Sequence, residues 1–332
     1  MLHTNTTRGW GIAIGMISIL FLMSASLVYG YTNTTWQDAY SSFFHPTSSN
    51  NHLIIRDVRL PRALIAGFIG ACLGVSGAIM QSITRNPLSS PSILGVNAGA
   101  SFFVVVGVVF LSIQSLQSYM WLSFAGATFA FLLVFILSST GREGLTPLKL
   151  TLAGSAITAL FASFTQGLLV LNETALDQVL FWLAGSVANR PLGLLFTALP
   201  YMIVALLLSF IRAKELNVLS IGDDVAVGLG QRTVWIKFFF GACAVILAGS
   251  AVAVAGPIGF VGIIIPHLIR SLVGLDHRSI LPYSAMGGAA LLLLADIGRR
   301  YILMPQELPV GVMTALIGVP FFIFVARRKL GI

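Results

Sequence analysis

Three arginines recur at intervals of three residues, at Arg56, Arg59 and Arg62. Residues three apart occupy neighbouring positions on a helix, so their guanidinium groups are expected to gather at one helix end. A guanidinium presents a planar fork of donors that meets a carboxylate in two parallel hydrogen bonds. A second basic pair, Arg299 and Arg300, lies near the other end of the chain. The sequence therefore predicts two helix ends that can bind carboxylates.

Asp296 precedes this second pair by three and four residues. That spacing on a helix favours ion pairs, so we expect Asp296 to be paired with the two arginines rather than catalytic. The sequence contains no Ser/His/Asp constellation, no paired carboxylates and no metal-ligand spacing of its five histidines. A membrane enzyme is therefore not favoured.

The elements that position these residues must lie in a membrane. The 332 residues are 57% hydrophobic and only 9% charged, with a mean hydropathy of +0.93, whereas soluble proteins carry about 25% charged residues. The net charge of +8 is not concentrated in a Lys/Arg cluster dense enough for nucleic acid. We expect an all-α polytopic membrane protein in which residues 1–332 form a single transmembrane domain.

Apolar runs of helical length predict about ten transmembrane segments. The first is too long for the apolar region of a signal peptide, so we expect an uncleaved helix. The eighth is short for a straight crossing and is expected to pack against protein. The predicted segments are about 10–31, 62–83, 93–111, 119–139, 148–171, 194–211, 234–255, 258–272, 281–303 and 309–326.

The distribution of cations predicts that both termini are cytoplasmic, because Lys and Arg favour the inner side of a membrane. With this orientation 13 of the 19 Lys and Arg residues lie inside and six outside. Five of the six exceptions lie at the two basic helix ends described above. The exceptions are Arg56, Arg59, Arg62, Arg190, Arg299 and Arg300.

The second predicted segment carries small residues every four positions, at Ala66, Gly70, Gly74 and Ala78. Such a ladder lets another helix backbone approach closely inside a bilayer. Pro61 suits the first turn of this helix, where its missing N–H has no partner to lose.

Two long blocks resemble the FecCD-type permease family of ABC importers for iron–siderophore complexes, haem and cobalamin, over roughly residues 10–328. The first block contains Arg59-Leu60-Pro61-Arg62, Ser76-Gly77-Ala78, Gln81, Arg85-Asn86-Pro87-Leu88, Pro91 and Leu94-Gly95. The second contains Gly256-Pro257-Ile258-Gly259-Phe260-Val261-Gly262, Pro266-His267, Arg270, Asp276-His277-Arg278, Ala295-Asp296 and Glu307-Leu308-Pro309-Val310-Gly311. The resemblance implies the type II importer permease fold in the cell membrane.

The resemblance also implies partners. These are a second permease copy or a homologous permease, two ATP-binding cassette subunits and an extracytoplasmic substrate-binding lipoprotein. No cofactor is expected on this chain: it has no Gly-rich phosphate loop ending in Gly-Lys-Ser/Thr, so ATP and Mg would bind to the ATPase subunits. The expected cargo is an iron(III)–siderophore complex, with haem or cobalamin as the alternative. An ion-coupled secondary transporter is less favoured, because the carboxylates lie in loops or near segment ends rather than mid-membrane.

In the family, arginines matching Arg59, Arg62 and Arg300 form pockets that receive glutamates of the binding protein. Arg56 and Arg299 lack such a match. The alternative is that these arginines anchor helix ends at lipid headgroups.

The inner loop at about 212–231 resembles the family's pair of coupling helices, which dock on the ATPase. Gly222 can end the first short helix, Asp223 or Asp224 can cap the second, and Gly230 can close it. The alternative is a surface hairpin that merely joins two segments. The candidate coupling residues are Leu219, Gly222, Asp223, Val225, Ala226, Gly228, Leu229 and Gly230.

Two further sets of residues concern passage through the membrane. The resemblance places a cytoplasmic gate at Asn86, Leu88, Thr146 and Pro147. In the fifth segment, small and polar residues form one stripe of a helix, which fits either helix packing or the wall of a translocation path; the resemblance favours the path. The stripe comprises Thr151, Ser155, Thr158, Ala162, Thr165 and Gln166.

Overall fold

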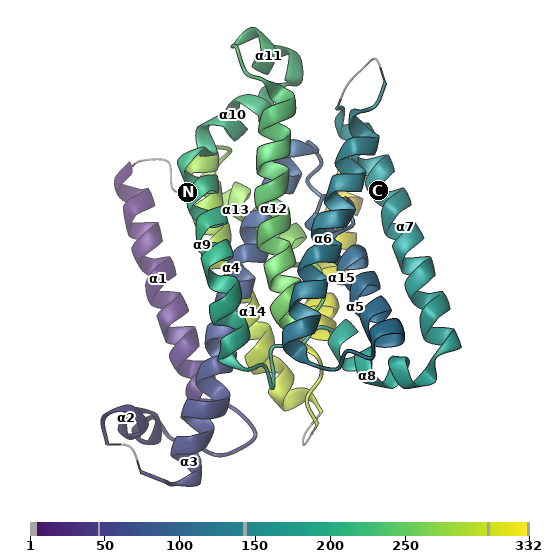
Figure 1. Ribbon diagram of the computed structural model, residues 1–332. Coiled ribbons are helices and arrows are strands. Elements are labelled where there is room, and N and C mark those ends of the chain that lie inside the picture. Colours follow the sequence, from purple (N-terminus) through teal and green to yellow (C-terminus); the bar gives the residue numbers. More distant parts are fainter. Residues whose placement is uncertain (1–4, 46, 142–144, 304–305, 331–332) are drawn as a thin grey trace.

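The computed structural model describes residues 5–45, 47–141, 145–303 and 306–330, and the regular structure in these ranges is helical throughout. Figure 1 shows the helices in one bundle. The long and medium helices are α1 (Asn5–Val28), α4 (Leu60–Ile83), α5 (Val96–Leu111), α6 (Leu116–Ser139), α7 (Pro147–Leu171), α9 (Leu192–Ile211), α12 (Thr233–Ala255), α13 (Val261–Val273), α14 (His277–Ile302) and α15 (Val310–Leu330). The short helices are α2 (Trp36–Phe44), α3 (Asn50–Leu53), α8 (Glu173–Leu183), α10 (Ala213–Ile221) and α11 (Asp223–Gly228).

The prediction of an all-α membrane protein is confirmed. In the described part of the chain, seven helices are long and apolar enough to cross a bilayer, and three shorter apolar helices occupy the remaining predicted segments. The shorter ones are α5, α13 and α15, so the eighth predicted segment is short as expected.

Helix α4 is the centre of the bundle, packed against α12, α13 and α14. Three of its glycines, Gly70, Gly74 and Gly77, face the backbone of neighbouring helices. A Cβ on Gly70 would collide with the backbone of Gly288, and one on Gly74 with the carbonyl of Ser284, both on α14. Gly77 makes the same close approach to Gly262 of α13. The predicted small-residue ladder is thus where the helix backbones meet.

The start of the second segment differs from the prediction. The helix does not begin at Pro61 but runs unbroken from Asn50 to Ile83, and the turn before α4, Ile54–Arg59, is π-helical. Proline in a helix removes a backbone donor and its ring crowds the preceding turn. A π-helical turn at this point loosens the helix where the proline must fit.

A non-helical stretch separates α12 from α13. Gly256 has φ of 78° and Phe260 φ of 67°, so the backbone twice enters the left-handed region. The stretch is covered by protein: the carbonyl of Ala255 accepts a hydrogen bond from the Ser186 N–H at 2.7 Å, and Gly256 lies against the carbonyl of Trp182. Irregular backbone at membrane depth is tolerated when it is enclosed in this way.

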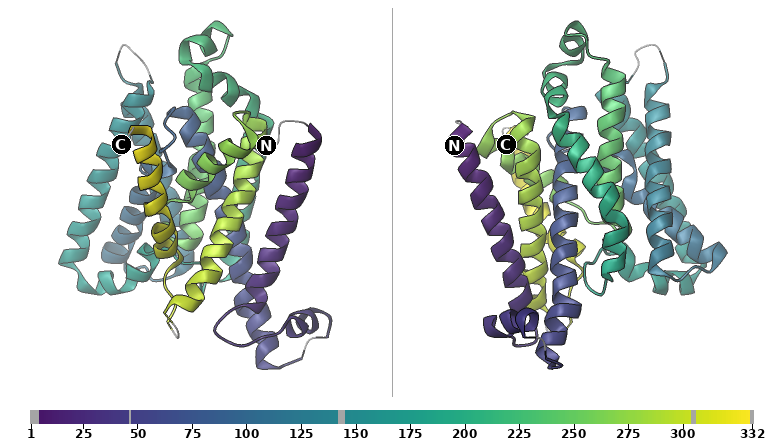
Figure 2. Two further views of the ribbon diagram at one scale, coloured as in Figure 1. Left: turned by 180° about the vertical axis from the view of Figure 1, so that it is seen from behind. Right: turned by 60° about the vertical axis from the view of Figure 1, so that its left-hand side comes forward.

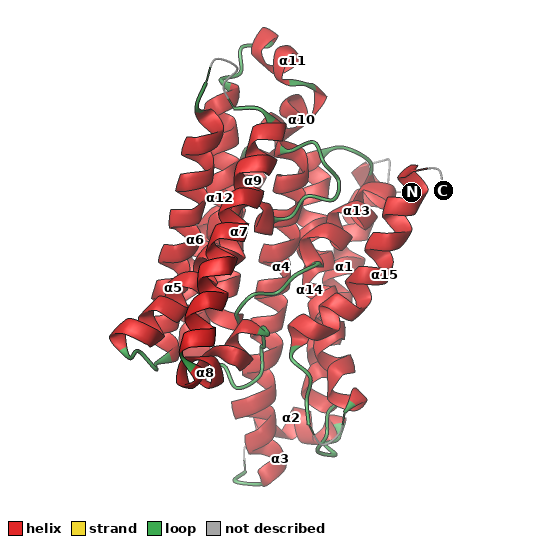
Figure 3. Ribbon diagram, turned by 90° about the vertical axis from the view of Figure 1, so that its right-hand side faces the viewer, coloured by secondary structure: helices red, strands yellow, loops and turns green. Residues whose placement is uncertain are grey.

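The two ends of the bundle carry different short helices. Both chain termini lie at one end, which we call the inner end, and α10 and α11 project beyond it (Figures 2 and 3). The opposite, outer end carries α2, α3 and α8 (Figure 1). Helix α8 follows α7 at this end, and Asn172 caps it by accepting a hydrogen bond from the Ala175 N–H at 2.9 Å.

We expect the outer end to be extracytoplasmic and the inner end cytoplasmic, with both termini inside. Tyr40 and Val225, 62% and 45% exposed at opposite ends, are suitable positions for single cysteines, whereas Arg300 is buried and unsuitable. Cys72 and Cys243 are buried and would first be replaced by Ala. In intact cells, a membrane-impermeant maleimide should label Tyr40→Cys but not Val225→Cys. Labelling of Val225→Cys from outside would reverse the orientation.

Candidate functional site

The outer end is built around the carboxylate of Asp296 on α14, which is fully buried. Asp296 accepts hydrogen bonds from Arg299 Nε at 2.9 Å and from Arg300 Nη2 at 2.6 Å, so the predicted pairing is confirmed. A third guanidinium, that of Arg62 on α4, donates from Nε at 2.8 Å. One buried carboxylate thus joins two helices that lie far apart in sequence.

The same arginines extend this network to two more segments. Arg62 Nη1 pairs with Glu307 at 2.8 Å, and Arg299 Nη1 donates to the carbonyl of Leu308, just before α15. Arg300 donates to the carbonyl and hydroxyl of Ser26 at the end of α1, each at 2.7 Å. The arginines therefore fix the outer ends of α1, α4, α14 and α15 relative to one another.

Arg59 serves the turn that follows α1. It donates to the carbonyls of Leu27, Val28 and Thr32 and to the Thr34 hydroxyl, at 2.6–2.9 Å. The three arginines with a predicted docking role, Arg59, Arg62 and Arg300, are only 5%, 6% and 2% exposed. Their guanidinium groups are directed into the protein. Arg56, which precedes them on the same helical run, is exposed.

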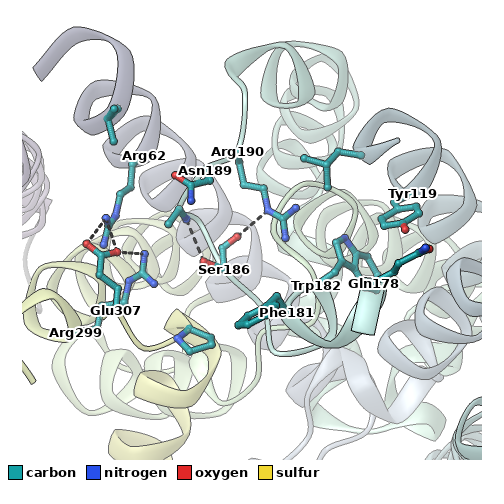
Figure 4. Close-up of a pocket in the computed structure, with 14 residues that line it drawn as sticks. Arg62, Tyr119, Gln178, Phe181, Trp182, Ser186, Asn189, Arg190, Arg299 and Glu307 are labelled. Carbon is teal, nitrogen blue, oxygen red and sulfur yellow. Dashed lines mark hydrogen bonds and ion pairs between the residues drawn. The ribbon is translucent and has the colours of Figure 1, made fainter. Parts of the chain in front are cut away.

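A pocket of about 570 Å³ opens beside this network at the outer end. It lies between α4, α8, the segment leading into α9 and the segment leading into α15; Figure 4 shows Arg62, Arg299 and Glu307 on one side and Arg190 with Trp182 on the other. Arg190 Nε donates to the carbonyl of Ser186 at 3.2 Å. Burial lowers the pKa of Arg190 below its usual value. Sequence reasoning placed Arg190 outside but gave it no role.

At the inner end, α10 and α11 form the predicted pair of short helices. Leu219 and Ala226 are fully buried and hold these helices to the rest of the chain, whereas Val225 and Leu229 are exposed. Ile221 and Val227, which the sequence analysis did not select, are also exposed, so the outward apolar surface comprises Ile221, Val225, Val227 and Leu229. Gly228 has open space where a side chain would stand. Gly230, with φ of 82°, closes α11 as expected.

The prediction that Asp223 or Asp224 caps α11 is wrong. Gly222 occupies the cap position, without a side-chain hydrogen bond. The Asp223 carboxylate is instead held by two cations, Arg85 Nη2 and Lys237 Nζ, each at 2.8 Å. Lys237 is buried and also donates to the carbonyl of Leu145 at 2.9 Å. One carboxylate on α11 therefore links the loop after α4 to the segment before α7.

The four predicted gate residues lie in these two linked segments and are all partly buried. The Asn86 side-chain oxygen accepts a hydrogen bond from the Leu88 N–H at 3.0 Å, which sets a tight turn. Thr146 caps α7 by accepting from the Lys149 N–H at 3.3 Å, and Pro147 is the first helical residue. Their local conformation is thus fixed by the loops themselves.

The polar stripe of α7 is divided between packing and an open face. Thr165 is buried and Thr158 donates to the carbonyl of Ser92 at 3.3 Å, so these two pack against protein. Thr151 is partly buried, whereas Ser155 and Gln166 are exposed. The hydroxyls of Thr151, Ser155 and Thr165 donate to carbonyls of their own helix, which removes their need for an outside partner.

The arrangement matches a known family of membrane proteins. Residues 17–328 match the FecCD transport family. The chain belongs to this family. It is 55% identical over 329 residues to the "Probable siderophore transport system permease protein YfiZ" of Bacillus subtilis, covering 99% of each chain. It is 40% identical over 316 residues to the "Ferric enterobactin transport system permease protein FepD" of Escherichia coli, covering 95% of this chain and 94% of that protein.

A solved structure supports the same assignment for this FecCD chain. The structure described as "An inward-facing conformation of a putative metal-chelate type ABC transporter" superposes with a TM-score of 0.84 at 30% identity, covering 96% of this chain and 98% of that one. The expected family is therefore confirmed, and the chain is a membrane permease.

We expect Asp296→Asn to destabilise this FecCD permease strongly. Removing one partner of a buried ion pair typically costs about 3–5 kcal/mol, and here three guanidinium groups would lose their shared carboxylate. Thermal unfolding in detergent should show a clearly lower Tm than for the wild type. Asp224→Asn is the matched control, because Asp224 is exposed and makes no ion pair with a described residue; equal Tm values for the two variants would contradict the role given to Asp296.

Proposed function

We propose that this chain is the transmembrane subunit of an ATP-driven ABC importer that moves an iron(III)–siderophore complex into the cell. The observation that carries the proposal is the match of nearly the whole chain to the FecCD transport family. The cargo is supported by the names of the two relatives above, a siderophore and a ferric enterobactin permease. An extracytoplasmic binding protein would deliver the cargo to the outer end.

The energy would come from a separate ATPase subunit that binds at α10 and α11. An exposed apolar patch beyond the inner end supports this role, because such patches mark sites where another protein binds. The patch comprises Ile221, Val225, Val227 and Leu229. The anchoring of these helices through Leu219, Ala226 and Asp223 supports it as well. A force applied to α11 would reach the rest of the chain through rigid contacts.

Two such permeases, identical or homologous, would enclose the translocation path. We assign Ser155 and Gln166 to the face of α7 that borders this path, since they are polar and exposed. Asn86, Leu88, Thr146 and Pro147 would narrow its cytoplasmic exit. The contacts of Asp223 support this assignment, because they connect the proposed ATPase-binding helix to one gate segment through Arg85 and to the other through Lys237.

For Arg59, Arg62 and Arg300 we propose an indirect docking role in place of the predicted direct one. In the described structure their guanidinium groups are bonded internally. We assign them the shaping of the outer surface that meets the binding protein. The exposed Arg56 is the better candidate for direct contact with it.

We expect Gly228→Trp to abolish transport. A tryptophan there has room within the chain but would project from the surface proposed to lie in the ATPase groove. Iron uptake by the assembled importer should fall at least about tenfold, since a misfit worth 1.4 kcal/mol already changes binding tenfold. Co-purification of the ATPase subunit should fall with it.

Gly193→Trp is the matched control for this experiment. Gly193 also has open space for a side chain but lies at the start of α9, at the outer end. We expect it to insert, bind the ATPase and transport normally. If Gly228→Trp retains both uptake and the ATPase, then α10 and α11 are only a connection between α9 and α12.

A further inference from the structure

The outer pocket has the size and lining of a small-molecule site. Its volume of about 570 Å³ lies within the range of roughly 300–1,000 Å³ that ligand pockets occupy. Tyr119, Phe181 and Trp182 supply flat apolar walls, and Gln178 and Asn189 supply amide groups (Figure 4). The arrangement suits an organic ligand that also carries polar groups.

The charges that line this pocket are unbalanced. Among the described lining residues, three are arginines, Arg62, Arg190 and Arg299, and one is a carboxylate, Glu307. Behind them Asp296 is shared among three guanidinium groups, which include Arg300. Three arginines therefore share two carboxylates, and Arg190 adds a fourth positive charge. Excess charge in a partly buried place is costly unless a counter-charge arrives.

Arg190 is the lining arginine without a carboxylate partner in the described ranges. Its Nε donates to the carbonyl of Ser186, and none of the carboxylates in the described ranges forms an ion pair with it. Behind the pocket wall, Nη2 of Arg62 is buried without a hydrogen-bond partner, and Nη2 of Arg299 is buried 3.5 Å from Glu307. Arginines on opposite sides of one cavity, with Arg190 lacking a carboxylate partner, suit an anion with several oxygens.

We infer that this pocket receives the cargo at the outer mouth and that Arg190 selects anionic ferric chelates over neutral ones. The inference rests on the proposed function and narrows its substrate class. Three hydroxamates, each carrying one negative charge, neutralise Fe³⁺, whereas citrate and catecholate ligands leave the complex negative. A pocket with excess positive charge favours the second kind. Glu307, the one carboxylate among the described lining residues, limits how tightly the anionic chelate is held.

The test is equilibrium binding of radioiron-labelled chelates to the importer complex in nanodiscs, without binding protein. The anionic probe is ferric dicitrate and the neutral probe is a ferric tris-hydroxamate. The wild-type importer should bind the anionic probe more tightly than the neutral probe, and its affinity for the anionic probe should fall as salt is added. Arg190→Gln should weaken anion binding roughly ten- to hundredfold, as expected for a hydrogen bond to a charged group, and leave the neutral probe unchanged. Arg190→Lys should restore part of the loss.

Two further variants test whether the affinity for the anionic chelate follows the charge of the pocket. Glu307→Gln should tighten anion binding, because it removes the lining carboxylate. Arg278→Gln, which removes an exposed arginine at the start of α14 that does not line the pocket, should leave the affinity for both probes unchanged. Opposite shifts at Arg190 and Glu307 would not arise from a general loss of structure.

The inference is overturned if wild type binds both probes equally, or if Arg190→Gln weakens them equally. It is also overturned if Arg190→Gln leaves chelate binding intact and weakens only the affinity for the binding protein, which would make the pocket a protein-docking site. The proposed function is tested separately by ATP-driven uptake. An importer that transports a neutral ferric chelate and ignores Arg190→Gln would retain its proposed function while losing this inference.

Discussion

The buried carboxylate of Asp296 is the interaction on which the outer half of the molecule depends. It accepts hydrogen bonds from guanidinium groups on both α4 and α14, and those guanidinium groups reach on to α1 and to the segment before α15. Arginine suits this role because one side chain can serve several acceptors at fixed angles. The glycine contacts between α4 and α14 bring the backbones close, and the ion pairs then hold the helix ends in register.

Asp223 has a comparable position at the inner end, with a different consequence. It is partly exposed and paired with one exposed and one buried cation, so it joins a peripheral helix to the interior rather than sealing a core. The outer network is therefore suited to a fixed surface, whereas the inner one is suited to passing movement from α11 to the loops beside α4 and α7. This contrast agrees with an importer that receives cargo at one end and energy at the other.

Much of this was predictable from sequence because bilayers restrict the chain to apolar helices. The segments, the glycine ladder on α4 and the pairing of Asp296 with its two neighbours all follow from spacing. The partners of Arg59 and Arg62 could not be predicted from spacing. Arg59 donates to backbone carbonyls on α1, and Arg62 donates to a carboxylate 234 residues away.

At the inner end, too, spacing in the sequence did not identify which residues are in contact. In helices as short as α10 and α11, spacing alone does not show which face is covered, so Leu219 and Ala226 were selected together with residues that prove exposed. Lys237 was missed because nothing in an apolar segment marks one lysine as the buried partner of a distant aspartate.

The most direct test of the account is ATP dependence of uptake in proteoliposomes that contain this permease with its ATPase subunit, supplied with binding protein and a radioiron-labelled siderophore complex. The account predicts that iron accumulates inside only when Mg-ATP is present on the side of α10 and α11, and that a proton or sodium gradient has no effect. Accumulation that follows an ion gradient and proceeds without ATP would contradict it.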